Sequence, residues 1–122
     1  MKKRYVVTGA CGHLGSTIVR MLQRAGESVY GLVLPGEPAQ DQAKIHYVRG
    51  DVRDIGSLRP LFADAEGEEI IVIHTAGIID ISEQVTDLMY AVNVGGTKNI
   101  LKLCQQVGVR RLVYVLSLIH IF

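Results

Sequence analysis

The stretch that decides the fold is Thr8-Gly9-Ala10-Cys11-Gly12-His13-Leu14-Gly15, which follows a short apolar run and precedes an amphipathic segment. The run before it, Tyr5-Val6-Val7, predicts a buried strand. The segment after it places Leu14, Ile18 and Leu22 at the spacing of one face of a helix. We therefore expect a strand, a glycine-rich turn and a helix in direct succession near the N-terminus.

A turn of this kind is typical of dinucleotide-binding sites, where each glycine has a mechanical reason. One permits the tight turn, one lets the pyrophosphate approach the backbone, and one allows the helix to pack closely on the strand. The helix then offers free N–H groups and the positive end of its dipole to the phosphates. The candidate cofactor contacts of the turn are Gly9, Cys11, Gly12, His13, Leu14 and Gly15. We expect His13 and Leu14 to contribute backbone and packing, and the Cys11 thiol to be a bystander.

Composition predicts one soluble domain. The chain has 122 residues, a net charge of +1 and a single short basic run, Lys2-Lys3-Arg4, so no nucleic-acid or anionic membrane partner is expected. The two cysteines, Cys11 and Cys104, form no metal or disulfide pattern, which favours a reducing compartment. The first strand leaves no room for a signal peptide, and the apolar residues 112–122 are too few to span a bilayer. We expect a cytoplasmic protein with no metal site.

Strands and helices alternate along the chain, which predicts an α/β fold with a doubly wound parallel sheet of the Rossmann type. The expected strands are Arg4–Thr8, Ser28–Leu34, Ile45–Arg49, Ile70–His74 and Arg111–Leu116. The expected helices are Leu14–Ala25, closed by Gly26, a short one from Asp54 to Phe62, and a long one, Val85–Val107, closed by Gly108. The core positions expected on the long helix are Leu88, Val92, Ile100, Leu103 and Val107.

Three downstream segments accompany the turn, whose spacing is Gly-x-x-Gly-x-x-Gly. They are Gly50-Asp51-Val52-Arg53-Asp54, His74-Thr75-Ala76-Gly77 and Asn93-Val94-Gly95-Gly96-Thr97. With these motifs the chain resembles the extended short-chain dehydrogenase/reductase superfamily, in particular its NAD-dependent epimerase/dehydratase group. The resemblance covers the whole chain but only the first third to half of a typical member, so it implies an incomplete domain over residues 1–122, truncated after about five strands and without the substrate-binding part.

The resemblance assigns roles to the first two of these segments. It implies that Asp51 accepts a hydrogen bond from the adenine amino group, with Val52 beside it, although a turn-forming role for Asp51 is the alternative. It also implies that the backbone of Thr75, Ala76 and Gly77 lies against the cofactor, where larger side chains would fill the ribose site. We expect the histidine before them to be held by hydrogen bonds and not to be catalytic.

The third segment lies inside the long predicted helix. Its two adjacent glycines forfeit about 2 kcal/mol of helix propensity, which suggests close packing on a neighbour. The resemblance implies that Asn93 supports the active site beside the cofactor, whereas a local backbone contact is the alternative. It also implies that the helix over residues 85–107 builds a homodimer interface.

The end of the second strand is where such folds choose between NAD and NADP. An acidic residue there bonds the ribose hydroxyls, whereas an arginine accommodates the 2′-phosphate. Here the strand ends in Leu32-Val33-Leu34, which is neither. Glu37 lies a few residues on, and both a ribose contact and a solvated loop position are open for it. The turn lacks the arginine common in phosphate-preferring relatives, so the expected cofactor is NAD or NADP, with NAD favoured.

The segment Val113-Tyr114-Val115-Leu116-Ser117 resembles the stretch that carries the family's catalytic serine, so the implied role of Ser117 is to polarise the substrate oxygen. The family's Tyr-x-x-x-Lys acid/base pair does not occur in the 122 residues. The resemblance therefore implies the cofactor-binding portion of an enzyme that transfers hydride at a carbinol carbon of a small molecule, inactive as given. A dihydroflavonol- or hydroxysteroid-type reductase and a non-catalytic dinucleotide sensor are the alternatives.

The last residues have a second interpretation. Residues 116–121 can be encoded by CTG TCT CTT ATA CAC ATC, the transposon end used to prepare sequencing libraries. On this hypothesis residues 116–122 are non-native, the native frame was cut near Val115, and Ser117 occupies the catalytic position by coincidence. A native apolar strand end is the alternative, and genomic DNA across the junction distinguishes the two.

Overall fold

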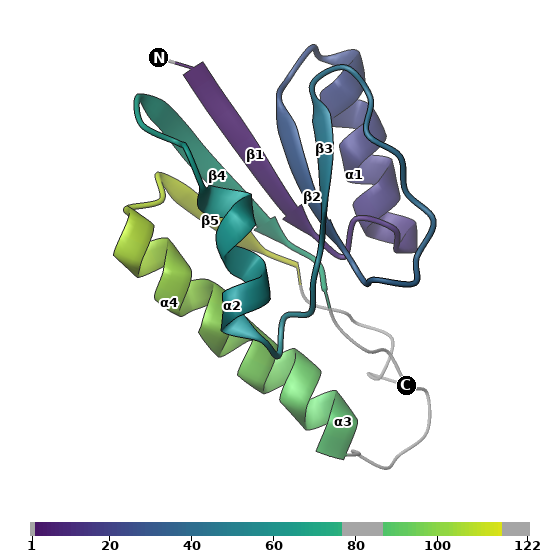
Figure 1. Cartoon of the computed structure of the whole chain (residues 1–122), viewed down its shortest axis with the longest axis vertical. Helices are drawn as coiled ribbons and strands as arrows, with labels where there is room; N and C mark the ends of the chain where they lie inside the picture. The colour runs from purple at the N-terminus through teal and green to yellow at the C-terminus, as the bar shows by residue number, and fades with distance from the viewer. Residues whose placement is uncertain (1, 77–86, 116–122) are drawn as a thin grey trace.

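Five strands form one parallel sheet in the order β3-β2-β1-β4-β5 in the computed structural model, which describes residues 2–76 and 87–115 (Figure 1). The strands are β1 (Lys2–Thr8), β2 (Val29–Val33), β3 (Ile45–Arg49), β4 (Glu68–His74) and β5 (Arg111–Tyr114). Every pairing is parallel, and β1 and β4 pair along the whole of β1, from Lys2↔Glu68 to Thr8↔His74. The fold class expected from the sequence is confirmed.

The helical segments cover both faces of this sheet. They are α1 (His13–Arg24), α2 (Ile55–Leu58), η1 (Arg59–Phe62), α3 (Asp87–Tyr90), η2 (Ala91–Gly96) and α4 (Thr97–Val107). Alternation along β1 creates two cores: Val7 packs with Val19 of α1, whereas Val6 packs with Leu58 of α2 and Ile100 of α4. Helix α1 therefore covers one face, and α2 and α4 cover the other (Figure 1).

The predicted helix ends are confirmed by their capping geometry. Gly26 adopts a left-handed φ of +76°, with its N–H bonded to the Gln23 carbonyl and the Glu27 N–H bonded to the Leu22 carbonyl. Gly108 closes α4 in the same region, at φ +79°. The Asp54 side chain caps α2 by accepting a hydrogen bond from the Gly56 N–H.

The long helix differs from the prediction in the segment η2, which is π-helical. A π-helical turn contains more residues than an α-helical turn, so the buried face of α4 does not continue at the same spacing into α3. Leu88 is consequently 50 % exposed, and Val107, the last residue of α4, is 41 % exposed. Leu14 is also exposed, because the core contacts of α1 begin one turn later at Ile18. The core positions expected at Leu88 and Val107 were wrong, whereas Ile100 and Leu103 are buried as expected.

Candidate functional site

The glycine turn lies at the carboxyl end of β1, and its glycines are required by close backbone contacts. Gly9 has a left-handed φ of +63°, and a Cβ on it would lie 2.9 Å from the Thr75 Oγ1 and 3.0 Å from the Ala76 nitrogen. A Cβ on Gly15 would lie 1.9 Å from the Gly9 carbonyl oxygen. The first helical turn of α1 therefore packs directly against the backbone that leaves β1, as the sequence predicts.

The N-terminus of α1 is available to an anion. Its N-cap is Gly12, which offers no side-chain acceptor, and no acidic residue lies in the first turn. The first helical N–H groups, from His13 to Gly15, lack carbonyl partners within the helix, and the Ser16 N–H is the first to bond back, to Gly12 at 2.9 Å. Unpaired N–H groups and the positive end of the helix dipole together favour a phosphate at this position.

The Cys11 thiol in this turn is not activated as a nucleophile. It donates a hydrogen bond to the Pro38 carbonyl at 3.3 Å. Burial, and then the nearby Glu37 carboxylate, raise the pKa of Cys11, while Arg49 opposes them. The protonated thiol is a poor nucleophile, which agrees with the bystander role.

Thr8 joins the end of β1 to the segment after β4. Its Oγ1 accepts hydrogen bonds from the backbone N–H groups of Thr75 and Ala76, each at 3.0 Å. These two bonds occupy both acceptor positions of the hydroxyl oxygen, so its proton is donated to the Nδ1 of His74 at 2.6 Å. The backbone at residues 75–76 is thereby fixed against β1.

The same geometry determines the protonation of His74. Because Nδ1 accepts from Thr8, Nε2 carries the ring proton and donates it to the Thr97 Oγ1 at 3.0 Å. The Thr97 hydroxyl in turn donates to the Asn93 carbonyl at 2.7 Å. Burial of the imidazole, which is 1 % exposed, lowers the pKa of His74 to about 4. His74 is thus a neutral, fully bonded core residue that links β1, β4 and α4.

The loop after β3 is pinned onto the helix that follows η2. The Asn99 Nδ2 donates to the Val52 carbonyl at 2.8 Å, and Val52 is only 5 % exposed. The carboxylate of Asp51 is paired with Arg53 at 2.6 Å, and hydrogen bonding from that side chain lowers the pKa of Asp51. Asp51 is therefore an anionic acceptor at the carboxyl edge of the sheet, with its guanidinium partner beside it.

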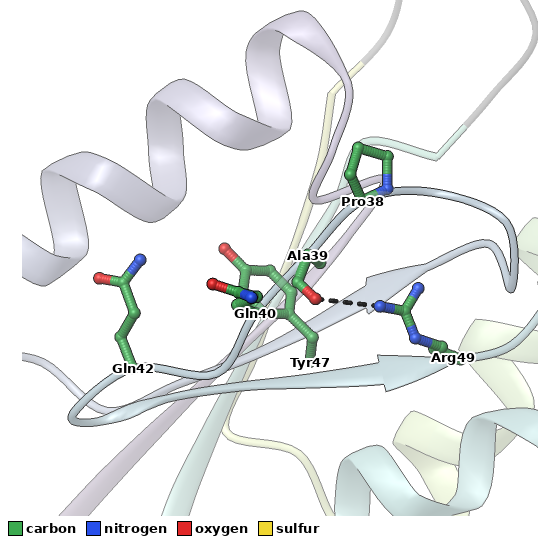
Figure 2. A pocket seen from close by; sticks show the side chains of 6 residues that line it. All are labelled: Pro38, Ala39, Gln40, Gln42, Tyr47 and Arg49. Atoms are coloured by element: carbon green, nitrogen blue, oxygen red, sulfur yellow. Dashed lines mark hydrogen bonds between the residues drawn. The ribbon is translucent and has the colours of Figure 1, made fainter.

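A shallow hollow of about 650 Å³ lies beside β3 and the loop that precedes it. It is lined by Pro38, Ala39, Gln40, Gln42, Tyr47 and Arg49 (Figure 2). The Arg49 guanidinium donates to the carbonyls of Glu37 at 2.6 Å and Ala39 at 3.0 Å, and the second bond is drawn in Figure 2. The hollow lies along the edge strand of the sheet, whereas the glycine turn lies between the ends of the central strands β1 and β4.

This arrangement can be compared with known proteins. A family model for the 3-beta hydroxysteroid dehydrogenase/isomerase family matches residues 6–122. The chain belongs to this family. The assignment agrees with the extended short-chain dehydrogenase/reductase superfamily expected from the motifs, and places the chain in its hydroxysteroid branch.

Individual proteins similar to this family member include a hydroxysteroid dehydrogenase and an epimerase. Over 121 residues the chain is 40 % identical to Uncharacterized protein 052L of Frog virus 3, covering 94 % of the chain and 33 % of that protein. Over 123 residues it is 36 % identical to human 3 beta-hydroxysteroid dehydrogenase type 7, covering 93 % of the chain and 32 % of the enzyme. The structure of Thermus thermophilus UDP-glucose 4-epimerase in complex with NAD superposes with a TM-score of 0.76 at 31 % identity, covering 89 % of the chain and 36 % of the epimerase. The chain thus spans about a third of the length of its curated relatives.

Most of the site residues predicted from the sequence lie at the carboxyl ends of the strands in this family member. The turn residues and the segment Thr75–Ala76 lie together at the carboxyl ends of β1 and β4, and Asp51 and Val52 follow the carboxyl end of β3, with β2 between β3 and β1. Asn93 lies in η2, where its carbonyl accepts from Thr97. Gly77 and Ser117 lie outside the described residues.

Sequence reasoning missed three residues that organise this edge: Thr8, Thr97 and Asn99. Their hydrogen bonds join positions far apart in the chain, up to 68 residues for Thr8 and Ala76. The only local signals were a threonine directly before the first glycine, and a threonine and an asparagine four and six residues after Asn93.

Within residues 2–76 and 87–115, no group of three or more His, Cys, Asp or Glu side chains could hold a metal ion. None of the helices that the structure describes is long and apolar enough to cross a membrane.

Proposed function

We propose that this chain binds NAD or NADP and forms the dinucleotide-binding portion of a hydride-transferring enzyme. One observation carries the proposal: α1 begins without an acidic residue or side-chain cap and packs on a turn in which a Cβ at Gly9 or Gly15 would collide with backbone. Such a turn lets the helix start close to the strand end, and the helix start supplies the partial positive charge that holds a pyrophosphate. The NAD complex of the Thermus thermophilus epimerase supports the same assignment.

Each part of the cofactor has residues suited to it. The N–H groups of residues 13–15 would hold the pyrophosphate, and Asp51 and Val52 would contact the adenine. The backbone at Thr75 and Ala76, fixed by Thr8, would lie against the ribose and nicotinamide side. When bound, the nicotinamide ring supplies a site that accepts or returns a hydride. We also propose that Gly77 contributes to cofactor binding, and that Asn93 supports the site from η2.

For the whole protein we propose oxidoreduction at a secondary alcohol carbon of a small molecule. The family match and the human relative named for a 3 beta-hydroxysteroid favour a steroid-like alcohol, which was the alternative drawn from the sequence. An epimerase or dehydratase reaction uses the same cofactor half and remains the second candidate, favoured by the Thermus thermophilus structure. In either case Ser117 would polarise the substrate oxygen.

Two further proposals concern the cellular location and the oligomeric state of the protein. We propose a cytoplasmic location, supported by two free cysteines. We also propose a homodimer formed through α3 to α4, supported by the exposed apolar side chains of Leu88, Tyr90 and Leu101 on these helices.

The test of cofactor binding uses the exposed N-terminal residue of α1. A His13→Glu substitution places an anion in the first turn, where it stabilises the helix by about 0.3–1 kcal/mol. The same charge repels a bound pyrophosphate, so the affinity for NAD and NADP, measured by isothermal titration calorimetry, should fall at least about tenfold. The matched control, His13→Gln, should bind like the parent chain.

Opposite effects on stability and affinity distinguish a phosphate site from general damage to the fold. A variant that is as stable as the parent and binds equally well would place the cofactor elsewhere. A parent chain that binds neither nucleotide at millimolar concentration would overturn the proposed function.

A further inference from the structure

The carboxylate of Asp51 is held by the residue two positions further along the chain. Its Oδ1 accepts from the Arg53 backbone N–H at 2.9 Å and from the Arg53 Nε at 3.0 Å. Its Oδ2 accepts from the Arg53 Nη2 at 2.6 Å and from Nε at 3.1 Å. The backbone bond closes the local turn after β3, whereas the other three come from a side chain. Since a carboxylate offers about four acceptor positions, Arg53 occupies most of the capacity of Asp51.

The backbone beneath this pair is fixed by the fold. The Asp51 N–H donates to the Ser57 Oγ at 3.0 Å, and the Asp51 carbonyl accepts from the Asp54 N–H at 2.9 Å. A Cβ on Gly50 would lie 2.9 Å from the Ser57 carbonyl oxygen, so the strand end packs directly on α2. The Asp51 carboxylate is therefore anchored, and the Arg53 side chain is the partner that can move.

The pair presents an acceptor and a donor side by side. The side chain of Arg53 is 47 % exposed and that of Asp51 is 25 % exposed. Among the described residues, Asp51 is the only acceptor that the guanidinium meets, and the Nη1 group donates to none of them. Hydrogen bonding between the two side chains lowers the pKa of Asp51 and raises that of Arg53, so both are charged at neutral pH.

These two groups match both kinds of purine base. Adenine carries a donor at its 6-amino group beside an acceptor at N1, whereas hypoxanthine and guanine carry an acceptor at O6 beside a donor at N1. A carboxylate alone accepts from the 6-amino group and repels O6. A guanidinium with a free N–H can donate to O6, as arginine does to guanine. An adjacent carboxylate and guanidinium are therefore complementary to either order of donor and acceptor.

Adenine can reach the carboxylate although Arg53 occupies it. An ion pair as exposed as this one is weakly held, because water solvates both charges. A base donating its 6-amino group to Asp51 therefore displaces a side-chain bond of Arg53 at little cost. The backbone bond to the Asp51 Oδ1 does not depend on the guanidinium, so the turn keeps its shape when the side chain moves.

Resting on the proposed function, we propose that Arg53 is a specificity-determining residue for the purine base: with Asp51 it forms an edge that binds 6-oxo purines as well as adenine. The chain then accepts nicotinamide dinucleotides of either kind. Without Arg53 the same edge is a bare carboxylate, which binds only the 6-amino base well.

The experiment compares NAD with nicotinamide hypoxanthine dinucleotide, in which an oxo group replaces the 6-amino group. Isothermal titration calorimetry gives the dissociation constants of both for the full chain and for Arg53→Met. The parent chain should bind the two within about fivefold of each other. In Arg53→Met the preference for NAD should rise at least about tenfold, the range of one hydrogen bond to a charged group.

The ratio of the two affinities removes the main complication. Loss of a positive charge weakens the binding of both dinucleotides through their phosphates, and this common effect cancels in the ratio. The matched control, Arg59→Met, removes an exposed arginine of η1 that makes no bond to Asp51 and should leave the ratio unchanged. Methionine keeps an unbranched stem at both positions.

Each outcome bears on one of the two proposals. A parent preference for either dinucleotide beyond about fivefold overturns the role of Arg53 and leaves dinucleotide binding standing. A smaller rise than about tenfold in Arg53→Met, or an equal rise in Arg59→Met, overturns that role as well. Binding of neither dinucleotide overturns the proposed function and this inference together.

Discussion

The adjacent glycines Gly95 and Gly96 of η2 should respond to alanine with opposite signs. A Cβ on Gly96 would lie 2.5 Å from the Val52 Cγ2, about 0.9 Å short of the 3.4 Å at which ordinary contacts begin. Val52 has no room to retreat, because it is 5 % exposed and its carbonyl is held by Asn99 at 2.8 Å. A Cβ on Gly95 meets no atom of the described residues within 4 Å.

The magnitudes follow from these contacts. Overpacking costs about 1–3 kcal/mol and the gain in helix propensity returns up to about 1 kcal/mol, so Gly96→Ala should lose about 1–2 kcal/mol of unfolding free energy. Gly95→Ala has only the gain and should stabilise the chain by about 0.5–1 kcal/mol.

Urea denaturation followed by circular dichroism measures both changes, provided that the slope with denaturant stays constant. Gly96→Ala should also cost at least about 1 kcal/mol less in a Val52→Ala background, because the collision is relieved there. Equal effects of the two alanines, or the same cost with and without the Val52 side chain, would refute the packing argument.

Three other predictions concern the core and the turn. Arg4→Met should lower the unfolding free energy by about 3–5 kcal/mol, since it removes the ion pair of this buried side chain and its hydrogen bonds to three carbonyls. In the control, Lys3→Met at an exposed position should change the unfolding free energy by less than about 0.5 kcal/mol. The pKa of His74 falls from 6.5 to about 4 on folding, so its stability contribution is full above pH 6.5 and is lost as the pH falls towards 4, by about 3 kcal/mol in all. Denaturation at several pH values should show this loss in the parent chain relative to His74→Asn, and matching curves would contradict it. Gly15→Ala should displace α1 from the Gly9 carbonyl and abolish NAD-induced stabilisation in a thermal shift assay, an effect that unchanged ligand response would rule out.

The fold could be predicted because its signals are local. Apolar runs and glycine caps predict all five strands and the ends of α1 and α4 to within a few residues. The π-helical segment η2 could not be predicted, since a change in residues per turn leaves no mark on composition. The exposure of Leu88 follows from the same cause, because an α-helical spacing was carried through a segment that does not have it.

The candidate site, like the fold, could be predicted where its signals are local and not where it depends on contacts between distant residues. The glycine turn is encoded in eight consecutive residues, and the reason for each glycine can be stated from the spacing alone. The pairing of Thr8 with His74 depends on the register of β1 with β4, which brings together positions 66 residues apart. The Glu37 carboxylate accepts from the Leu34 N–H at 2.7 Å, and from the sequence this contact was indistinguishable from a solvated glutamate.

The bonds around Thr8 indicate that this edge of the sheet is preorganised for its ligand. The hydroxyl of Thr8 accepts two backbone N–H groups and donates to His74, so its capacity is used before any ligand arrives. The backbone of residues 75–76 is therefore positioned by folding, and a ligand lying against it need not supply the ordering free energy.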